Sequence, residues 1–276
     1  MEQRYIVHEL LKSITNSLSL NIPRASREAQ LLLMSYLNVD ELWLITNQST
    51  QVQNVEKLLE WVERRAKNEP FEYITNKVSF YSEEFYIAPG ALIPRPETEI
   101  LIDEVLKYAP DLNAAFQFAE VGVGSGIISI MLAKKFPNAR IIAVDISADA
   151  LRIAQENIQR FGLQNRIELR LGSLLDVVSE KIDYLVSNPP YIENGVSLES
   201  NLDYEPQNAL FGGKVGDEII KALLDEVLKR EIKFFSCEMG YDQKDKISSY
   251  LKDTKIKDLN FYKDYADFDR GFTLRL

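Results

Sequence analysis

The stretch "FQFAEVGVGSGII", residues 116–128, decides how this chain folds. It starts as an apolar strand, passes through glycines at the alternate positions 122, 124 and 126, and continues as an apolar helix from Ile127. Glycine lets a backbone turn tightly and approach a ligand that a Cβ atom would exclude. The stretch therefore predicts a strand, a ligand-binding loop and a helix in immediate succession.

Strand and helix patterns keep alternating after this stretch. The strand patterns are "RIIAVD", "RIELRLGS", "IDYLVSN" and "KFFSCEMG", and helical patterns run from Ser147 to Phe161 and near 216–231. Such alternation predicts an α/β fold, with a doubly wound, mostly parallel sheet that helices cover on both faces. The last patterns, "LNFYKD" and "GFTLRL", predict an antiparallel pair at the sheet edge.

The chain before this region divides into two parts. Residues 1–68 carry a helical period, because apolar residues recur three and four positions apart from Ala29 to Leu37. We expect a small helical domain there that docks the substrate. Residues 69–94 are aromatic and β-favouring and end in Pro-Gly, which predicts a β-hairpin linker to a catalytic domain over residues 95–276.

Composition narrows the function classes. The net charge of -10 argues against a long footprint on nucleic-acid phosphates, although a local basic patch remains possible. Cys237 and His8 are the sole cysteine and histidine, so we expect no disulfide, no metal site and no Ser-His-Asp triad. The sequence has no apolar run long enough to span a membrane and starts with no signal-peptide pattern, so we expect a cytoplasmic protein.

The glycine loop indicates the cofactor. A dinucleotide fingerprint needs a third glycine where this chain has Ile127. The spacing instead resembles the acidic-x-Gly-x-Gly-x-Gly loop of methyltransferases that use S-adenosyl-L-methionine (AdoMet). Asp145 ends the next strand, roughly twenty residues on, where a carboxylate can accept both hydroxyls of a ribose.

The segment "SNPPYI", residues 187–192, follows the strand pattern "DYLVS". Two prolines make it stiff and leave it with carbonyl acceptors but few N–H donors. The Asn188 side-chain oxygen and the Pro189 carbonyl can each accept one hydrogen of a planar NH2 group, and the Tyr191 ring can lie against that group. The segment therefore predicts methylation of an amino or amide nitrogen by orientation and electrostatics.

Together these residues resemble the PrmC/HemK family, the protein-(glutamine) methyltransferases of peptide chain release factors. The resemblance covers most of the chain. It is carried by the glycine loop, Asp145 and a series of further motifs: "PRPETE" at 94–99, "SNPPYI" at 187–192, "YEPQNALFGG" at 204–213, "CEMGYDQ" at 237–243 and the late "DFDRGF".

The family implies a seven-stranded sheet of the class I AdoMet-dependent methyltransferase type, and it implies the site residues. AdoMet would lie against Glu120, Gly122, Val123, Gly124, Ser125, Gly126, Asp145, Leu174 and Asn188. The substrate glutamine would lie on Asn188, Pro189, Pro190 and Tyr191, with Arg95 and Glu97 nearby; Asn188, Pro189 and Tyr191 would be catalytic.

The chain departs from the family pattern at three positions. Glu120 stands in place of an expected Asp, Val123 in place of Thr, and Leu174 where some members have an aromatic residue beside the adenine. We expect a modest loss of AdoMet affinity from these changes. None of them removes the catalytic group.

The function expected from this resemblance is methyl transfer from AdoMet to the side-chain amide nitrogen of the glutamine in the Gly-Gly-Gln motif of release factors. We expect a monomer that binds neither a membrane nor nucleic acid stably. Two alternatives stay open. One is adenine-N6 methylation of DNA or RNA, because "NPPY" is shared with adenine-amino methyltransferases, and the other is a catalytically idle AdoMet-fold binding module.

Overall fold

The computed structural model describes residues 5–109 and 111–276. The chain forms two compact units. The helical unit contains the described residues up to Asn76 together with Glu199–Tyr204, and the sheet unit contains Lys77–Leu198 and Glu205–Leu276. Each unit has its own hydrophobic core.

The helical unit is built from amphipathic helices whose apolar stripes face one another. Leu10, Leu32 and Leu58, from three different helices, are almost fully buried in its core. Two short strands, β1 (Tyr5–Ile6) and β2 (Gln51–Val52), pair antiparallel beside the helices. The helices are α1 (Val7–Leu18), α2 (Ala25–Leu37), α3 (Glu41–Thr46), α4 (Glu56–Ala66) and α5 (Phe71–Thr75).

A short return segment, Glu199–Tyr204, belongs to the helical unit although it lies far along the chain. The Asn68 Nδ2 atom donates to the Ser200 hydroxyl over 2.6 Å. The Tyr204 hydroxyl donates to the Lys67 carbonyl over 2.8 Å. The chain thus leaves the sheet unit after Leu198 and re-enters it at Glu205.

The sheet unit begins with a β-hairpin, β3 (Lys77–Phe80) and β4 (Glu83–Tyr86). Its two turn residues, Tyr81 and Ser82, both have positive φ, as a tight two-residue hairpin turn requires. The hairpin is fastened to the next helix, since the Tyr81 N–H donates to Glu99 over 2.6 Å.

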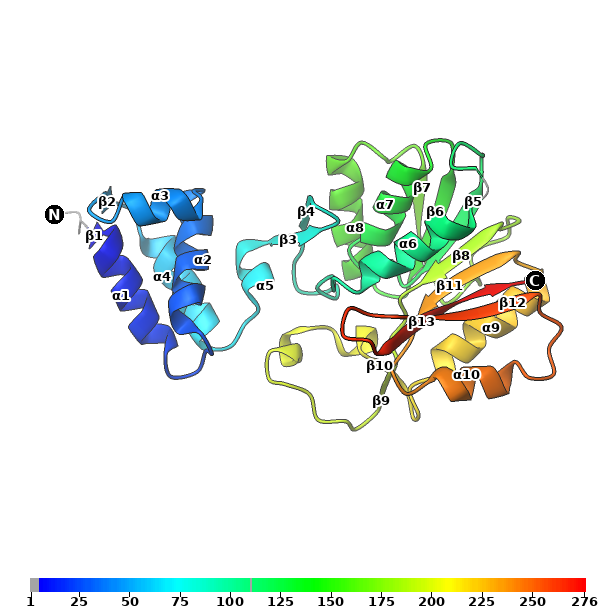
Figure 1. Ribbon diagram of the computed structural model, residues 1–276. Coiled ribbons are helices and arrows are strands. Elements are labelled where there is room, and N and C mark those ends of the chain that lie inside the picture. The colour runs from blue at the N-terminus through cyan, green and yellow to red at the C-terminus, as the bar shows by residue number, and fades with distance from the viewer. Residues whose placement is uncertain (1–4, 110) are drawn as a thin grey trace. The chain divides into compact units, whose positions relative to one another are not determined.

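A seven-stranded sheet forms the centre of this unit, in the order β12-β13-β11-β8-β5-β6-β7 (Figure 1). Five strands run parallel, β13 is antiparallel to β11, and β12 is antiparallel to β13 at the edge. The predicted doubly wound, mostly parallel fold with a terminal antiparallel pair is confirmed. The strands are β5 (Gln117–Val121), β6 (Arg140–Asp145), β7 (Ile167–Leu171), β8 (Tyr184–Ser187), β11 (Phe234–Glu238), β12 (Asp258–Lys263) and β13 (Asp269–Arg275).

Helices cover both faces of the sheet (Figure 1). Alternate residues of β5 point to opposite faces of the sheet. Ala119 and Val121 join a core with Leu223 of α9 (Glu218–Arg230) and Ile247 of α10 (Lys244–Tyr250). Phe118 points to the other face and packs on the rings of Phe136 and Tyr184. One layer contains α6 (Thr98–Tyr108), α7 (Ile127–Lys135) and α8 (Ala148–Arg160), and the other contains α9 (Glu218–Arg230) and α10 (Lys244–Tyr250). The short parallel strands β9 (Ile192–Glu193) and β10 (Phe211–Gly213) lie outside the main sheet, and a 3-10 turn covers Gln207–Ala209.

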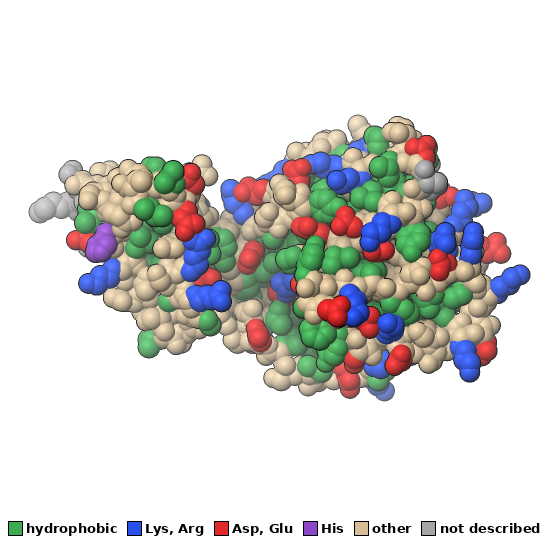
Figure 2. Space-filling model, viewed as in Figure 1, with side chains coloured by type: hydrophobic (Ala, Val, Ile, Leu, Met, Phe, Trp, Pro, Cys, Tyr) green, Lys and Arg blue, Asp and Glu red, His purple; other side chains and the backbone are tan. Residues whose placement is uncertain are grey.

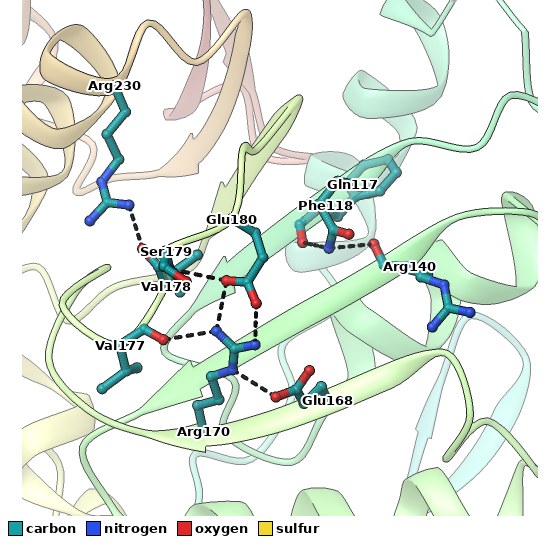
Figure 3. Close-up of polar contacts among 10 residues, drawn as sticks. All are labelled: Gln117, Phe118, Arg140, Glu168, Arg170, Val177, Val178, Ser179, Glu180 and Arg230. Atoms are coloured by element: carbon teal, nitrogen blue, oxygen red, sulfur yellow. Dashed lines mark hydrogen bonds and ion pairs between the residues drawn. The ribbon is translucent and has the colours of Figure 1, made fainter.

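Arginine side chains organise the loop that follows β7. Figure 3 shows the Arg170 guanidinium between Glu168 and Glu180, with bonds of 2.8 Å to the former and 2.6 Å to the latter. Arg170 also donates to the Val177 carbonyl over 2.8 Å. Arg230 of α9 donates to the carbonyls of the same loop, so the loop is held from two sides.

Candidate active site

A cavity of about 300 Å³ lies where β5, β6 and β8 end. The strand order reverses beside β5, because β6 continues the sheet on one side and β8 on the other. The carboxyl ends of strands at such a reversal form the crevice in which open α/β sheets bind ligands. The glycine loop follows β5, and the Asn-Pro-Pro segment follows β8, so the fold brings the two predicted motifs to one cavity.

The glycine loop turns under the cavity through positive φ angles at Gly122 and Gly124. The Gly122 N–H donates to the Val144 carbonyl over 2.8 Å, which ties the loop to β6. Val123 and Ser125 line the cavity with these glycines. A Cβ atom at Gly124 would meet nothing within 4 Å, so its glycine is required by the backbone angle rather than by crowding.

Gly126 has a different role from its neighbours. It does not line the cavity, and a Cβ atom there would lie 3.2 Å from the Ala154 Cβ of α8. Its φ of 84° also favours glycine at the start of α7. The third glycine therefore permits α7 to pack closely on α8.

Asp145 reaches the cavity from the end of β6. Its Oδ2 accepts the Gly124 N–H and its Oδ1 accepts the Ser147 N–H, both over 2.9 Å. Burial raises the pKa of this carboxyl, while these N–H groups oppose the rise. Each oxygen keeps a lone pair, so the carboxylate can accept two further hydroxyl hydrogens.

Glu120 places a second carboxyl under the glycine loop and is fully buried. Its Oε2 accepts both the backbone N–H, over 2.9 Å, and the hydroxyl of Ser129. Among the described residues its Oε1 has no hydrogen-bond partner. Burial raises the pKa of Glu120 to about 8, the hydrogen bonds from Ser129 oppose the rise, and the Asp145 charge adds to it.

Asn188 projects from the end of β8 into the cavity, and Pro189 and Pro190 form part of the wall. Its Nδ2 donates to the Thr98 hydroxyl oxygen over 3.1 Å. The Oδ1 atom is thereby left for another donor. The segment ends β8 as expected, and its role as an acceptor of substrate hydrogens stays a prediction.

Tyr191 lies beside the cavity but outside its lining residues. Its ring packs against the sheet core, and its carbonyl accepts from Gln243 over 3.0 Å. Burial raises the pKa of Tyr191, the nearby Glu238 adds to the rise, and Arg270 opposes it. The side chain is thus a fixed neutral phenol next to the Asn-Pro-Pro wall.

The "PRPETE" segment at 94–99 and the "YEPQNALFGG" segment at 204–213 are joined by an ion pair between Arg95 and Glu205. The Arg95 guanidinium donates to Glu205 Oε1 over 2.5 Å, and the other oxygen of Glu205 accepts the Ile93 N–H over 2.9 Å. Arg95 lines the cavity, whereas Glu97 does not and instead occupies the cap position of α6. This pair holds the "PRPETE" segment against the "YEPQNAL" segment.

Several cavity residues were missed when the sequence was analysed alone. Four of those named below, Thr98, Pro206, Asn208 and Phe211, stand in the shared motifs, which could have indicated them, whereas Leu92 and Ile146 lie in turns outside the motifs and carry no such signal. The missed lining residues include Leu92, Thr98, Ile146, Pro206, Asn208 and Phe211.

Gly212 of β10 lies directly behind the Asn-Pro-Pro wall. A Cβ atom at this position would lie 2.4 Å from the Pro190 carbonyl oxygen and 2.5 Å from the Gly216 carbonyl oxygen. Both neighbours are backbone atoms that cannot rotate away. Glycine is therefore required for β10 to support the wall.

Gly172, Ser173 and Leu174 line the cavity after β7, and Leu174 is the residue for which the resemblance implies a place beside the adenine. Leu174 adopts a φ of 49°, which is rare for a leucine, and it is held in a loop that Arg170 and Arg230 anchor. Its side chain offers an apolar surface without a ring.

Within residues 5–109 and 111–276, no group of three or more His, Cys, Asp or Glu side chains has the arrangement of a metal site. Over the same residues, none of the helices combines the length and the apolarity needed to cross a membrane.

Comparison with protein families matches both parts of the chain. The PrmC N-terminal domain matches residues 9–75, and the methyltransferase small domain matches residues 96–203. Among solved structures, the N-terminal domain of human METTL16 in complex with SAH aligns with a TM-score of 0.51 at 14% identity, over 82% of this chain and 85% of that one. Human methyltransferase 10 domain containing protein aligns with a TM-score of 0.52 at 15% identity, over 71% and 89%. These likenesses show the fold.

Relatives of known name are considerably more similar. The release factor glutamine methyltransferase of Koribacter versatilis is 40% identical over 240 residues, covering 84% of each chain. Those of Clostridium botulinum and Dictyoglomus turgidum are 38% and 36% identical, covering 90% and 95% of this chain and 91% of each relative. The chain belongs to the release factor glutamine methyltransferase family.

Proposed function

We propose that this protein transfers the methyl group of AdoMet to the side-chain amide nitrogen (N5) of the glutamine in the Gly-Gly-Gln motif of peptide chain release factors, leaving S-adenosyl-L-homocysteine. One observation carries the proposal. A single cavity is lined by an acidic glycine loop, by Asp145 and by the Asn188 side chain, whose Nδ2 is engaged by Thr98 so that Oδ1 is left to accept a hydrogen.

The cavity fits AdoMet by the chemistry of its polar groups. Over the part of the chain that the structure describes, the buried Glu120 Oε1 atom has no hydrogen-bond partner, as expected of a carboxylate beside a cationic amino group. The Asp145 carboxylate can accept ribose hydroxyls, and Leu174 with Ile146 supplies apolar surface for a base. When bound, AdoMet supplies an electrophilic methyl group on a sulfonium sulfur.

The protein's contribution to the reaction is to position and polarise the amide. The Asn188 Oδ1 and the Pro189 carbonyl would each accept one hydrogen of the substrate NH2 group, which fixes the direction of the nitrogen lone pair. The nitrogen gains positive charge as the methyl group arrives, and the two acceptors then bind it more strongly. Tyr191 would support the amide from the side, and Arg95 with Glu97 would flank the substrate chain.

The release factor is the proposed partner, and the helical unit is proposed to hold its body while the Gly-Gly-Gln loop enters the cavity. We propose that the enzyme acts as a monomer, in the cytoplasm and without stable nucleic-acid binding. The net charge of -10 supports the last point. On the face of the sheet unit seen in Figure 2, Lys and Arg side chains are interspersed with Asp and Glu rather than gathered into a stripe.

Substitution of Asn188 tests the function. With labelled AdoMet and a purified release factor, Asn188→Ala should lower kcat by on the order of a hundredfold, because one preorganised acceptor of the transition state is lost. Asn260→Ala, which removes an exposed asparagine on β12, is the matched control and should leave kcat unchanged.

Two outcomes would contradict the proposal. An unchanged kcat with a raised KM in Asn188→Ala would make the residue a binding contact only. Methylation of adenine in DNA, with none of the release factor, would overturn the substrate.

A further inference from the structure

Thr98 links the Asn188 carboxamide to a buried acid that does not line the cavity. Thr98 is the first residue of α6, and Glu238 is the last residue of β11; each is 1% exposed. The Thr98 oxygen accepts from Asn188 Nδ2 over 3.1 Å. Cys237 pairs with Ser187 in the parallel sheet, so Glu238 lies beside Asn188 where β11 and β8 end, and the Thr98 hydroxyl lowers the pKa of the Glu238 carboxyl.

The direction of these two bonds follows from the number of hydrogens. A threonine hydroxyl has one hydrogen to donate, and an ionised carboxylate can only accept. While Glu238 is ionised, the Thr98 hydrogen must therefore go to Glu238, and the Thr98 oxygen is left to accept. Only the NH2 end of the Asn188 carboxamide can then face Thr98, and the oxygen end faces the substrate.

We propose that Thr98 and Glu238 are positioning residues, which act through Asn188 and hold its carboxamide with the oxygen toward the substrate amide. This inference rests on the proposed function, in which Asn188 Oδ1 accepts a substrate hydrogen. With Glu238 protonated, the acid can donate to Thr98, and Thr98 can donate in turn to the Asn188 oxygen. The carboxamide then turns its NH2 end to the substrate NH2 group, and two donors face each other.

The surroundings of Glu238 shift the pKa of its carboxyl toward neutral pH. Burial raises its pKa to about 7, the Thr98 hydrogen bond and the Arg270 charge oppose the rise, and the Glu97 charge adds to it. Arg270 is shared with Asp264, to which it donates over 2.8 Å. Burial raises the pKa values of the nearby Cys237, Tyr191 and Tyr262, and the Glu238 charge adds to each rise.

A merely structural role does not explain this arrangement. Glu238 Oε1 has no hydrogen-bond partner among the described residues, so the carboxyl is not satisfied by its surroundings. A buried carboxyl with an unpartnered oxygen costs stability. A hydrophobic residue at this place on β11 would fill the same space without that cost.

The experiment compares Thr98→Val, Thr98→Ser, Glu238→Gln and wild type, as full-length proteins. The kcat on a purified release factor is measured at saturating AdoMet between about pH 5.5 and 8. In parallel, the side-chain NH2 resonances of Asn188 are followed in 15N-labelled protein and assigned by their loss in Asn188→Ala. Thr273→Val, an equally buried threonine on β13, is the control and should keep the wild-type kcat.

The expected results separate positioning from folding. Wild-type kcat and the Asn188 resonances should both change with a midpoint near pH 7, with kcat falling toward lower pH. Thr98→Val should lower kcat about 10- to 100-fold, the range for residues that orient a functional side chain, with a smaller change in KM. Thr98→Ser, which keeps the hydroxyl, should restore most of the activity. Glu238→Gln should lower kcat and abolish both titrations.

Other outcomes would overturn the inference. A Thr98→Val enzyme with wild-type kcat, equal losses in Thr98→Val and Thr98→Ser, or an unchanged titration in Glu238→Gln would each do so. If wild type fails to methylate any release factor, the proposed function fails instead. The Asn188 resonances still decide the orientation in that case, since they require no turnover.

Discussion

Glu120 shows how a single residue couples the site to stability. Its carboxyl has a folded-state pKa of about 8 against an ordinary value of 4.5, and burial is the main cause. Between pH 4.5 and about 8, Glu120 has lost its proton in the unfolded chain but keeps it in the folded protein. The contribution of Glu120 to stability is therefore complete below pH 4.5 and is lost as the pH rises toward 8.

Replacing this group should flatten the pH dependence of stability. In the cofactor-free protein, Glu120→Gln should reduce the fall in unfolding free energy between about pH 5 and 7.5, by about 1.4 kcal/mol for each pH unit. Urea unfolding at several pH values measures this. Glu63→Gln, at an exposed position on α4, is the control and should leave the slope as it is. A slope unaltered by Glu120→Gln would show that Glu120 is ionised in the folded protein.

Asp145 tests the cofactor assignment at the same scale. Its carboxylate is fixed by the N–H groups of Gly124 and Ser147, so it needs little reorganisation to accept ribose hydroxyls. Asp145→Ala should weaken AdoMet binding by about 1.5 to 3 kcal/mol, the range for a hydrogen bond to a charged group. Calorimetric titration provides the measurement, and unchanged affinity would remove the ribose assignment.

At the scale of elements, the loop after β7 depends on side chains that lie outside the cavity. The Arg170 guanidinium lowers the pKa of the Glu180 carboxyl to about 2, so the pair stays ionised over the working range of pH. Arg170 also holds the Val177 carbonyl. Together these bonds maintain the loop conformation in which Leu174 faces the cavity.

Loss of this anchor should affect cofactor binding more than chemistry. Arg170→Gln should raise the KM for AdoMet severalfold, increase amide hydrogen exchange over residues 172–180, and leave kcat at saturation nearly unchanged. Arg160→Gln breaks an exposed pair with Glu156 on α8 and serves as the matched control. A lower kcat with normal exchange in Arg170→Gln would contradict the anchoring role.

The elements themselves were largely predictable because their signals are local. The strands before the glycine loop and before Asn188 follow from apolar runs, and Ser147 caps α8 by accepting the Ala150 N–H. The contacts that orient the site were not predictable in this way. Thr98 and Asn188 lie 90 positions apart, and Arg95 and Glu205 lie 110 apart, so no periodicity relates them.

At the scale of the whole molecule, the return segment has no signal in the amino-acid pattern. The predicted catalytic domain, residues 95–276, includes residues 199–204, whereas the structure groups them with the helices. A boundary drawn along the sequence cannot divide the chain in this way. Truncation at residue 68 would therefore strip the return segment of partners such as Asn68 and Lys67, and it is a poor test of the helical unit.

Surface substitutions test the docking role of the helical unit without truncation. Leu42 and Ile45 of α3 are 69% and 64% exposed. If they contact the release factor, changing both to serine should lower kcat/KM for the folded factor by on the order of 100-fold or more, since burying each such side chain stabilises a complex by about 1.5 to 3 kcal/mol. A short peptide with the same Gly-Gly-Gln motif should be methylated as before.

The control for this pair is Leu20→Ser, which changes another exposed leucine of the helical unit. Steady-state kinetics on both substrates with each variant gives the comparison. An equal loss on the peptide, or no loss on the folded factor, would exclude a docking role for this surface.

The crowding around Gly212 has a consequence for how this enzyme can change over generations. Even the methyl group of alanine would clash with the Pro190 carbonyl oxygen, so no single substitution at position 212 leaves the structure undisturbed. Gly195, with a φ of 88° and nothing within 4 Å of a built Cβ atom, is limited by conformation alone and can pass to asparagine at small cost. In a saturation library selected for methylation, position 195 should therefore drift while position 212 stays invariant.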